Sequence, residues 1–529
     1  MTLREITPRT DDEIVSTRRS GMESGGDHFG LAAWLRRRAR RDPDRAAITF
    51  EEQTLTYSVL QKRIEEFANH LSATGVRPGD RVAYLGFNDV TLIVALFAAA
   101  RVGAIFVPLN FRLTGAELAY VVNDSGATVL IADVDHTVTV DGIAEQLPVK
   151  NYISLDHDRE GWERFQPGID LPFVDEETAD PDAPGLILYT SGTTGKPKGA
   201  VLTHRNLFTN NVNWVLSCDY RRDHTGLTSA PLFHSGGLCV MVLPLLMAGG
   251  HVVLQRHFDT AAVIEDVAKY RVSTMFLVPT MMLYLTQTAG FADADFSSVE
   301  FVVAGAAPVP EPLLRVFGDR GVSVSQCWGL TETATGATFL SPEWAFLKVG
   351  SCGTPGVLNE VMLVDIGTGQ QLSAPGVPGE LCVRGDTVTP GYWNRVEATL
   401  EAQLPGGWFR TGDVAYQDDD GFYYICDRLK DMVITGGENV YPAEVESVLY
   451  EHPDIVEVAV IGEPDEEWGE RVVAVVVPRG DSIVTLEVVR DFLDGRLARY
   501  KLPRELRVRT ELPRNTTGKI MKHVLRERS

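Results

Sequence analysis

Hydroxyl groups, glycines and lysines are concentrated in one twelve-residue stretch of the chain. Residues 189–200 read Tyr-Thr-Ser-Gly-Thr-Thr-Gly-Lys-Pro-Lys-Gly-Ala. Short apolar runs at residues 185–188 and 200–202 flank it, so the pattern predicts a loop between two strands, and Thr203 then opens a helix. Glycine lets the backbone approach an anion closely, and N–H groups, hydroxyls and ammonium groups can then surround phosphate oxygens. The stretch therefore predicts a phosphate-binding loop.

Two other phosphate motifs are excluded. A Walker A loop requires Ser or Thr after its lysine, but Pro197 follows Lys196. No Gly-x-Gly-x-x-Gly opens a helix, so the dinucleotide fingerprint is absent as well. The remaining alternative is an ordinary surface loop, which rarely places so many phosphate-binding groups directly after a buried strand.

A second group of candidate residues ends a strand predicted at residues 323–327. The chain reads Gln-Cys-Trp-Gly-Leu-Thr-Glu-Thr from residue 326 to 333, and open α/β sheets bind ligands at the carboxyl ends of their strands. The aromatic plane of Trp328 can stack on a purine, and the carboxylate of Glu332 can hold Mg²⁺ beside phosphates. The alternative is a core tryptophan and a helix-capping glutamate.

Further candidates lie toward the C-terminus. Asp413, in a Thr-Gly-Asp turn, can accept both hydroxyls of a ribose, whereas the alternative is an ordinary Asx-turn. Alternating charges at residues 427–431 are typical of a linker, and the Gly-Gly-Glu at residues 436–438 leads into a helix with Pro442 at its first position. Lys519 follows Thr-Gly in a predicted turn and can deliver a mobile cation.

His234 lies in Pro-Leu-Phe-His-Ser-Gly-Gly, which follows a strand predicted at residues 225–230. A lone histidine is usually structural. The small residues after this one would let a substrate pass close to its ring.

The elements that must position these residues alternate along the chain. Strands and helices alternate up to residue 327, which predicts a parallel sheet covered by helices. Among the predicted helices are residues 90–101, 237–248 and 486–497. Short alternating runs separated by Gly and Pro indicate a small β region from residue 348 to about residue 424, and the last hundred residues predict a compact α/β module.

The motifs and their order resemble those of the acyl-adenylate-forming superfamily, in its acyl-CoA synthetase branch, over nearly the whole chain after residue 28. The resemblance implies an α/β fold. Its large N-terminal adenylation domain, residues 29–427, would contain doubly wound sheets and the small β region. A small, mobile α+β C-terminal domain, residues 428–529, would rotate about a hinge near Lys430, and residues 1–28 would form a polar tail.

The resemblance also implies roles for individual residues. Lys519, His234, Thr190 and Glu332 would be catalytic; Glu332 would bind the metal, and His234 would gate the passage between the carboxylate site and the CoA tunnel. ATP would be bound by Thr190, Ser191, Gly192, Thr193, Thr194, Gly195, Lys198, Gly305, Ala306, Ala307, Gln326, Trp328, Gly329, Thr331, Asp413, Arg428 and Lys519. CoA would contact Gly436, Gly437 and Glu438. A largely apolar acyl pocket would contain Trp214, His234, Leu238, Val278, Cys327 and Leu330.

The chain departs from the family pattern at two of these positions. Trp328 stands where tyrosine is commoner, which should not harm stacking. Cys327 stands where glycine is common and adds volume at the floor of the implied acyl pocket.

The reaction implied by the resemblance is that of an AMP-forming acid–thiol ligase, an acyl-CoA synthetase that uses ATP, Mg²⁺ and CoA. A carboxylate would attack the α-phosphate to give acyl-AMP and pyrophosphate, and CoA would then take the acyl group and release AMP. The acid would be largely apolar, a fatty acid or similar. Alternatives are an aryl (cinnamate-type) or bulky polycyclic acid, and an acyl-AMP ligase that loads a carrier protein.

More distant alternatives are an amino-acid adenylation module, a luciferase-like oxygenase and a catalytically silent ligand-binding protein. The first usually has an aspartate in its pocket, where this chain offers Phe233, His234 and Ser235. ATP binding would argue against the last.

Composition limits the partners. The formal net charge of −23 argues against nucleic acid and against a membrane surface that binds by charge. Six scattered cysteines without a Cys-x-x-Cys motif indicate reduced thiols in a cytoplasmic chain. The longest apolar stretch, residues 90–109, is interrupted by Arg101 and Gly103, so we expect no transmembrane segment. The expected partners are a small-molecule carboxylic acid and CoA, and the enzyme would be a monomer or a homodimer.

Overall fold

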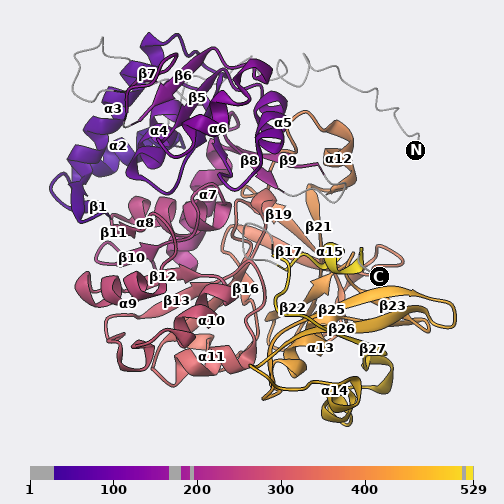
Figure 1. Ribbon diagram of the computed structural model, residues 1–529. Coiled ribbons are helices and arrows are strands. Elements are labelled where there is room, and N and C mark those ends of the chain that lie inside the picture. Colours follow the sequence, from indigo (N-terminus) through magenta and orange to yellow (C-terminus); the bar gives the residue numbers. More distant parts are fainter. Residues whose placement is uncertain (1–28, 156, 166–179, 191–195, 515–519, 528–529) are drawn as a thin grey trace.

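The computed structural model describes residues 29–155, 157–165, 180–190, 196–514 and 520–527. Four sheets build it, of seven, nine, six and five strands. The first two belong to the lobes coloured indigo to pink in Figure 1, the third is coloured orange, and the fourth belongs to the gold C-terminal lobe. The α/β fold class predicted from the sequence is confirmed.

The seven-stranded sheet has the order β7-β6-β5-β3-β4-β8-β9 and is parallel except for β9, which pairs antiparallel with β8. Its strands are β3 (Arg81–Leu85), β4 (Ile105–Leu109), β5 (Val129–Ala132), β6 (Asn151–Ser154), β7 (Glu163–Arg164), β8 (Pro184–Thr190) and β9 (Lys198–Thr203). The helices around it are α3 (Tyr57–Ala73), α4 (Val90–Arg101), α5 (Gly115–Ser125), α6 (Thr137–Asp141) and η1 (Ala144–Gln146). The predicted helix at residues 90–101 matches α4, which is buried along its whole length.

The nine-stranded sheet has the order β16-β15-β14-β13-β12-β10-β11-β1-β2. Its strands are β1 (Ala46–Phe50), β2 (Gln53–Thr56), β10 (Thr225–Thr228), β11 (His251–Leu254), β12 (Thr274–Leu277), β13 (Phe301–Ala304), β14 (Ser323–Trp328), β15 (Thr338–Phe339) and β16 (Thr354–Pro355). The associated helices are α2 (Leu31–Arg41), α7 (His204–Ser217), η2 (Gly236–Val242), α8 (Leu243–Ala248), α9 (Thr260–Lys269), α10 (Pro279–Gln287), η3 (Phe291–Asp293), α11 (Glu311–Gly318), η4 (Thr331–Thr333) and η5 (Pro342–Trp344).

The largest hydrophobic core lies between these two sheets. Alternate strand residues face it, such as Val82 and Tyr84 of β3, while Ala83 and Leu85 face the separate core that includes residues of α5. Because both faces of each sheet are covered, their central strands are almost entirely apolar. The ligand-binding edge is then the line of carboxyl ends of the parallel strands.

The third sheet is antiparallel, and β22 pairs with β21 outside its main order β18-β17-β19-β21-β20. Its elements are β17 (Asn359–Val364), β18 (Gln371–Leu372), β19 (Gly379–Gly385), α12 (Val396–Glu401), β20 (Gln403–Leu404), β21 (Trp408–Gln417) and β22 (Tyr423–Arg428).

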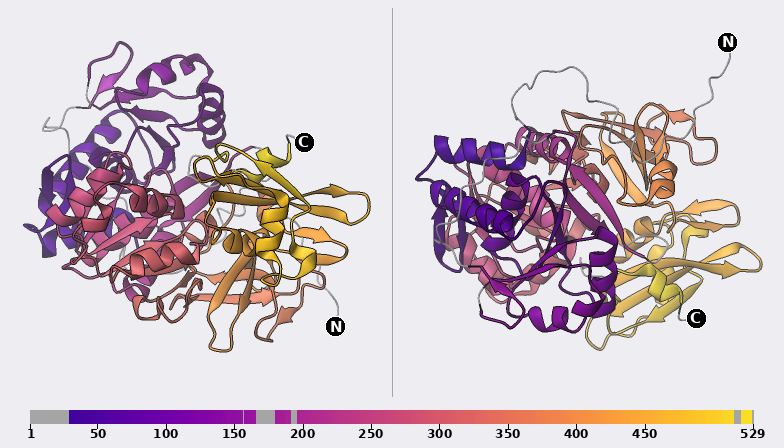
Figure 2. Two further views of the ribbon diagram at one scale, coloured as in Figure 1. Left: turned by 60° about the horizontal axis from the view of Figure 1, so that its bottom comes forward. Right: turned by 90° about the horizontal axis from the view of Figure 1, so that it is seen from above.

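The C-terminal lobe contains the fourth sheet, with the order β24-β23-β26-β25 and with β27 paired to β26. Its elements are β23 (Val433–Thr435), β24 (Glu438–Val440), α13 (Pro442–Leu449), β25 (Ile455–Asp465), β26 (Gly469–Pro478), α14 (Leu486–Leu493), η6 (Arg499–Lys501), β27 (Glu505–Val508) and α15 (Lys522–Arg526). Both views of Figure 2 show this gold lobe beside the orange strands.

Two predicted helices are wrong in detail. Residues 237–248 do not form one α-helix, because Gly236–Val242 is a π-helix and only Leu243–Ala248 is α-helical. π-helical turns within helices often occur at functional sites. The helix predicted at residues 486–497 ends at Leu493, because Asp494 has an extended backbone and Gly495 has a positive φ.

Candidate active site

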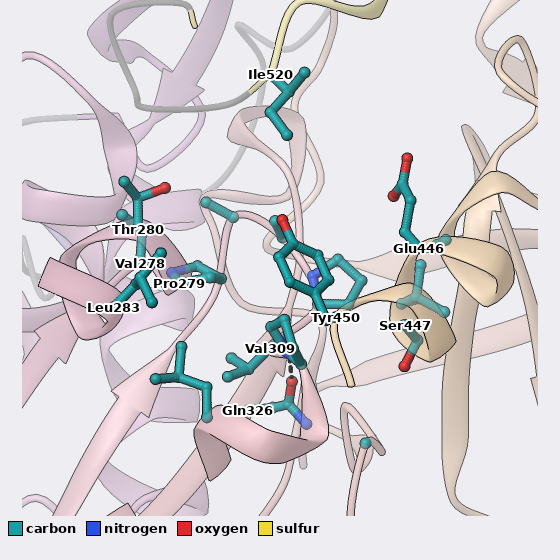
Figure 3. A pocket seen from close by; sticks show the side chains of 18 of the residues that line it. Val278, Pro279, Thr280, Leu283, Val309, Gln326, Glu446, Ser447, Tyr450 and Ile520 are labelled. Carbon is teal, nitrogen blue, oxygen red and sulfur yellow. Dashed lines mark hydrogen bonds between the residues drawn. The ribbon is translucent and has the colours of Figure 1, made fainter. Parts of the chain in front are cut away.

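A cavity of about 530 Å³ lies between the C-terminal lobe and the carboxyl ends of β13 and β14. In Figure 3, Val278, Pro279, Thr280 and Leu283 approach it from one side, and Glu446, Ser447 and Tyr450 of the segment at α13 approach it from the other. Many predicted nucleotide-binding residues line the cavity: Ala306, Ala307, Gln326, Trp328, Gly329, Asp413 and Arg428. Residues from four parts of the chain therefore meet at one site.

The backbone at the strand ends has features of a constrained site. Ala306 has a φ of +70°, which is unfavourable for a residue with a side chain. Gly329 has no room for one, because a Cβ there would lie 1.9 Å from the carbonyl oxygen of Thr335. The side chain of Gln326 accepts a hydrogen bond from Val309 N at 3.0 Å (Figure 3), so it also supports the loop after β13.

Asp413 is held from two sides. The indole Nε1–H of Trp328 donates to its Oδ2 at 2.8 Å, and Nε of Arg428 contacts its Oδ1 at 2.6 Å. Asp413 and Arg428 are directly opposite each other on the antiparallel strands β21 and β22. Trp328 is thus buried, with one edge bonded to Asp413 and its side chain on the cavity wall.

Glu332 lies next to the stem of the predicted phosphate loop. Its Oε1 accepts a hydrogen bond from the hydroxyl of Tyr392 at 2.7 Å. The ammonium group of Lys198 lies 5.5 Å from the centre of the Tyr392 ring. The structure gives Oε2 of Glu332 no partner among the residues it describes. One available carboxylate oxygen suits Mg²⁺, which binds one or two carboxylates together with phosphates and water.

Within the described part of the chain, no three His, Cys, Asp or Glu residues form a potential metal cluster. A metal at Glu332 would therefore depend on oxygens supplied by the nucleotide. The pKa of the Tyr392 hydroxyl is raised well above its usual range, first by burial and then by Glu332. Tyr392 is therefore a neutral donor to Glu332.

Side chains clamp the stem of the phosphate loop. The Tyr189 hydroxyl donates to Asp124 at 2.8 Å, and the Tyr120 hydroxyl donates to the carbonyl of Pro197 at 3.2 Å. Thr190 closes the stem by donating to the carbonyl of Lys198 at 3.4 Å. The predicted ligands Ser191, Gly192, Thr193, Thr194 and Gly195 lie outside the described residues.

Lys519 also lies outside the described residues, but residues on both sides of it, Arg514 and Ile520, line the cavity. Arg514 donates to Thr280 at 3.1 Å and contacts Glu457 at 2.9 Å, and so connects the C-terminal lobe to α10. Lys522 contacts the partly buried Glu446 at 2.8 Å. These contacts anchor both flanks of the segment that carries Lys519.

His234 is neutral at physiological pH. Burial, and then the nearby charge of Arg112, lowers its pKa to about 3. Its ring lies 4.2 Å from that of Phe233, and its Nε2 is shielded from solvent without a hydrogen-bond partner in the described structure. A neutral ring with a free nitrogen can act as a gate or a hydrogen-bond partner for a passing substrate.

The predicted acyl-pocket residues fall into three groups. Val278 and Cys327 line the cavity. Trp214 and Leu238 are fully buried in the main core. His234, Leu330 and the predicted nucleotide ligand Thr331 do not line the cavity, although Leu330 and Thr331 directly follow Gly329, which does. Gly305 faces Cys327, since a Cβ on it would lie 3.1 Å from the Cys327 sulfur. The acyl-pocket assignment remains a prediction.

The predicted CoA segment forms a tight turn between β23 and β24. Gly436 and Gly437 both have positive φ, of 60° and 84°, as a two-residue hairpin of this type requires. Gly436 also packs against Trp468, because a Cβ there would lie 2.9 Å from the indole ring. Glu438, at the start of β24, is exposed.

Lys430 is exposed in the turn between β22 and β23, which belong to different sheets. No local sequence pattern pointed to four supporting residues: Tyr392, Arg514, Glu446 and Lys522. Each is a polar residue in an unremarkable local context, and only its long-range contact identifies it.

Known proteins match this chain over most of its length. The chain matches a family model described as AMP-binding enzyme over residues 35–393, and one described as AMP-binding enzyme C-terminal domain over residues 444–519. It is 43% identical to a feruloyl-CoA synthase of Amycolatopsis over 505 residues, which covers 94% of this chain and 99% of the relative. It is 40% identical to an indoleacetate–CoA ligase of Aromatoleum aromaticum over 500 residues, covering 94% and 98%.

A solved structure of similar fold is the o-succinylbenzoate CoA synthetase of Bacillus subtilis in complex with an acyl-adenylate intermediate. Its TM-score is 0.83 at 33% identity, with 93% of this chain and 97% of that chain covered. None of the helices in the described residues is long and apolar enough to cross a membrane.

Proposed function

Because this chain belongs to the family of AMP-binding enzymes, it is an AMP-forming acyl-CoA synthetase that uses ATP, Mg²⁺ and CoA, and we propose that its acid is an aryl-substituted carboxylic acid with a polar group far from the carboxylate. Feruloyl and indoleacetyl groups, named for two relatives, both have this chemistry. A fatty acid is the second candidate, since a long-chain-fatty-acid–CoA ligase of Mycobacterium tuberculosis is 36% identical to the chain.

One observation carries the choice of an aryl acid: a group of buried polar atoms without partners lies behind Cys327. The Trp214 indole N–H, the Tyr220 hydroxyl and the Ser325 hydroxyl have no hydrogen-bond partner among the described residues. Ser325 and Cys327 are two apart on β14 and therefore face the same side of the sheet. The Tyr220 ring lies nearly parallel to that of Trp214, at 6.2 Å between centroids.

The depth of these groups fits an aryl acid. Two strand residues span about 6.6 Å, so Ser325 lies that far below Cys327 along the strand. This is comparable to the length of an arylalkenoic acid. A hydrocarbon tail would leave each buried polar group unpaired, at a cost of about 1–3 kcal/mol. A phenol, ether or indole N–H could instead pair with them.

The first half-reaction places developing charge on the α-phosphate. We propose that Asp413 and Arg428 hold the ribose, that the loop at residues 190–198 surrounds the phosphates, and that Lys519 stabilises the charge as the acid oxygen attacks. Glu332 would hold Mg²⁺, which when bound neutralises phosphate charge. Tyr392 keeps the carboxylate of Glu332 oriented.

For the second half-reaction, we propose that residues 428–529 rotate about Lys430 as a domain distinct from residues 29–427. Support comes from the sheets, because β22 ends at Arg428 and the next strand, β23, belongs to the C-terminal sheet. Rotation would bring Gly436, Gly437 and Glu438 toward the acyl group, past the neutral His234. The two steps have different requirements, which explains the use of a hinge.

We propose that the enzyme acts in the cytoplasm on a small-molecule acid and CoA. The support for this location is that all six cysteines are free thiols.

The test is a panel of acids in the presence of ATP, Mg²⁺ and CoA, with AMP and thioester both measured. The panel contains ferulate, 4-coumarate, unsubstituted cinnamate, indole-3-acetate, octanoate and decanoate. We expect kcat/KM for the hydroxylated cinnamates to exceed that for cinnamate by about tenfold. This ratio corresponds to the free energy of one hydrogen bond to a buried group. Preference for octanoate or decanoate would overturn the aryl assignment.

A matched variant is Tyr220→Phe, which removes the hydroxyl and keeps the ring. It should reduce the preference for 4-coumarate over cinnamate, and leave the rate with cinnamate nearly unchanged. Pyrophosphate release without thioester would contradict CoA as the acceptor and favour a carrier-loading enzyme.

A further inference from the structure

Trp328 lines the cavity, and the edge of its indole ring contacts Asp413. Its Nε1–H donates to Oδ2 of Asp413 at 2.8 Å, although the two residues are 85 positions apart in the sequence. Both are almost fully buried, with 8% and 4% of their surfaces exposed. A hydrogen bond to a carboxylate in such surroundings is stronger than one in water.

The two carboxylate oxygens of Asp413 are each held by a different residue. Trp328 holds Oδ2, and Arg428 holds Oδ1 at 2.6 Å. Two bonds at opposite oxygens fix the plane of the carboxylate as well as its position. An ionised carboxylate has about four acceptor sites, so an Asp413 held in this way can still accept hydroxyl groups from a ligand in the cavity.

Stacking on a purine does not require this arrangement. Phenylalanine also offers an aromatic plane but has no hydrogen-bond donor, and the donor of tyrosine is an O–H at the far end of its ring rather than an N–H on its edge. The chain has Trp328 at this position, and its indole N–H gives Asp413 a bond that an aromatic plane alone does not provide.

We propose that Trp328 is a positioning residue for the ribose: its indole N–H holds Asp413 in the orientation that accepts both ribose hydroxyls, and so makes the enzyme selective for ATP over deoxyadenosine triphosphates. The inference rests on the proposed function, because it requires the nucleotide to bind with its ribose at Asp413. It concerns the edge of the indole, whereas stacking concerns its face.

The experiment compares wild-type enzyme with Trp328→Phe, using ATP, 2′-deoxyATP and 3′-deoxyATP and measuring acid-dependent pyrophosphate release. We expect kcat/KM for ATP to fall by about tenfold in the variant, as for loss of a hydrogen bond to a charged group. The values for the deoxynucleotides should fall much less, because they lack one of the hydroxyls. The selectivity ratio should therefore fall about tenfold.

A purely structural role predicts a different result. If Trp328 only packs or stacks, all three nucleotides lose activity by the same factor and the ratio does not change, which would overturn the proposal. Trp408→Phe is the matched control: Trp408 is on the same strand as Asp413, but its ring packs on Arg384 at 4.7 Å. This control should keep the wild-type ratio.

A double-mutant cycle tests whether the effect passes through Asp413. Asp413→Asn alone should also reduce the ratio, and Trp328→Phe should reduce it little further in that background, since both changes remove the same interaction. Additive losses would overturn the assignment.

Thermal unfolding checks that the variants are folded. If Trp328→Phe is not, Trp328→Leu replaces it, because leucine also has no hydrogen-bond donor and the selectivity ratio should show the same fall. Wild-type enzyme without acid-dependent activity would reject the proposed function, whereas an active enzyme with an unchanged ratio would reject this inference alone.

Discussion

The Tyr392 hydroxyl donates a hydrogen bond to the Glu332 carboxylate at 2.7 Å, across 60 residues of sequence. A second link joins the same two segments, since Thr389 N donates to the carbonyl of Glu332 at 2.7 Å. The segment of Tyr392 also contacts β9, where Trp393 N donates to the carbonyl of Gly199 at 2.7 Å. One segment therefore fixes the carboxylate of Glu332, the predicted metal ligand, relative to the stem of the predicted phosphate loop.

Tyr392→Phe should weaken adenylation by about tenfold, because it removes one hydrogen bond to a carboxylate that must keep a fixed orientation. The loss should be larger at low Mg²⁺ and partly recovered at high Mg²⁺. Pyrophosphate release measured over a range of Mg²⁺ concentrations checks this. Tyr416→Phe, in a stacked pair with Tyr424, is the control, and equal losses at every Mg²⁺ concentration would contradict the role.

Lys519→Ala should reduce adenylation by at least about 10²–10³, as for the loss of one preorganised donor in an active site. Thioester formation from supplied acyl-AMP should change much less. The two half-reactions are measured separately, with Lys150→Ala, at an exposed position, as the control. Equal losses in both half-reactions would show that Lys519 does not have this role.

Lys430→Pro should preserve adenylation and impair thioester formation. Proline restricts its own φ and the residue before it, so it stiffens the turn between β22 and β23. Lys430→Ala is the matched control and should preserve both steps, since the side chain is exposed. A variant with proline that forms thioester at the wild-type rate would argue against a hinge at this position.

Cys327→Gly should shift the acid preference toward bulkier acids. The sulfur occupies space beside Gly305 and donates a weak hydrogen bond to the carbonyl of Ala304 at 3.5 Å. Its removal should raise the ratio of kcat/KM for a bulky polycyclic acid to that for cinnamate by about tenfold, in keeping with one or two methylene-sized differences in a pocket. Cys426→Ala serves as the control, and an unchanged ratio would place the acyl group elsewhere.

Stability should fall as the pH is lowered below about 6.5, the ordinary pKa of histidine. Burial lowers the pKa of His234 to about 3 and that of His251 to about 4. Between these values and 6.5, the unfolded chain binds protons that the folded chain does not, so acid favours unfolding. By pH 5, His234 alone should cost about 2 kcal/mol.

Chemical unfolding at pH 7.5 and pH 5.0 measures this loss. His234→Asn should lose less stability between these two pH values than wild-type enzyme does. His251→Asn should remove a second, independent part of the stability loss. An identical pH dependence in His234→Asn would show that His234 is not buried in its neutral form.

Local sequence patterns predicted the phosphate loop, and they determined the order of strands and helices and most of their limits. A run such as residues 90–101 is apolar on every side and can only be a buried helix, and Thr203 caps α7 through a hydrogen bond within three residues. These structures depend on neighbours in the sequence, so composition and spacing are sufficient to predict them. The family resemblance then supplied the expected roles of the site residues.

Only the tertiary structure decided how those residues support one another. The contacts of Trp328 with Asp413 and of Tyr392 with Glu332 join segments far apart in the chain. The edge of an indole and the orientation of a carboxylate depend on how strands from different sheets are placed, which no local pattern encodes. The π-helix at Gly236–Val242 likewise forms where Gly236 must pack against Phe276, because a Cβ there would lie 3.0 Å from that ring. Such close packing of distant segments is a property of the folded core, and it decided the details of the site.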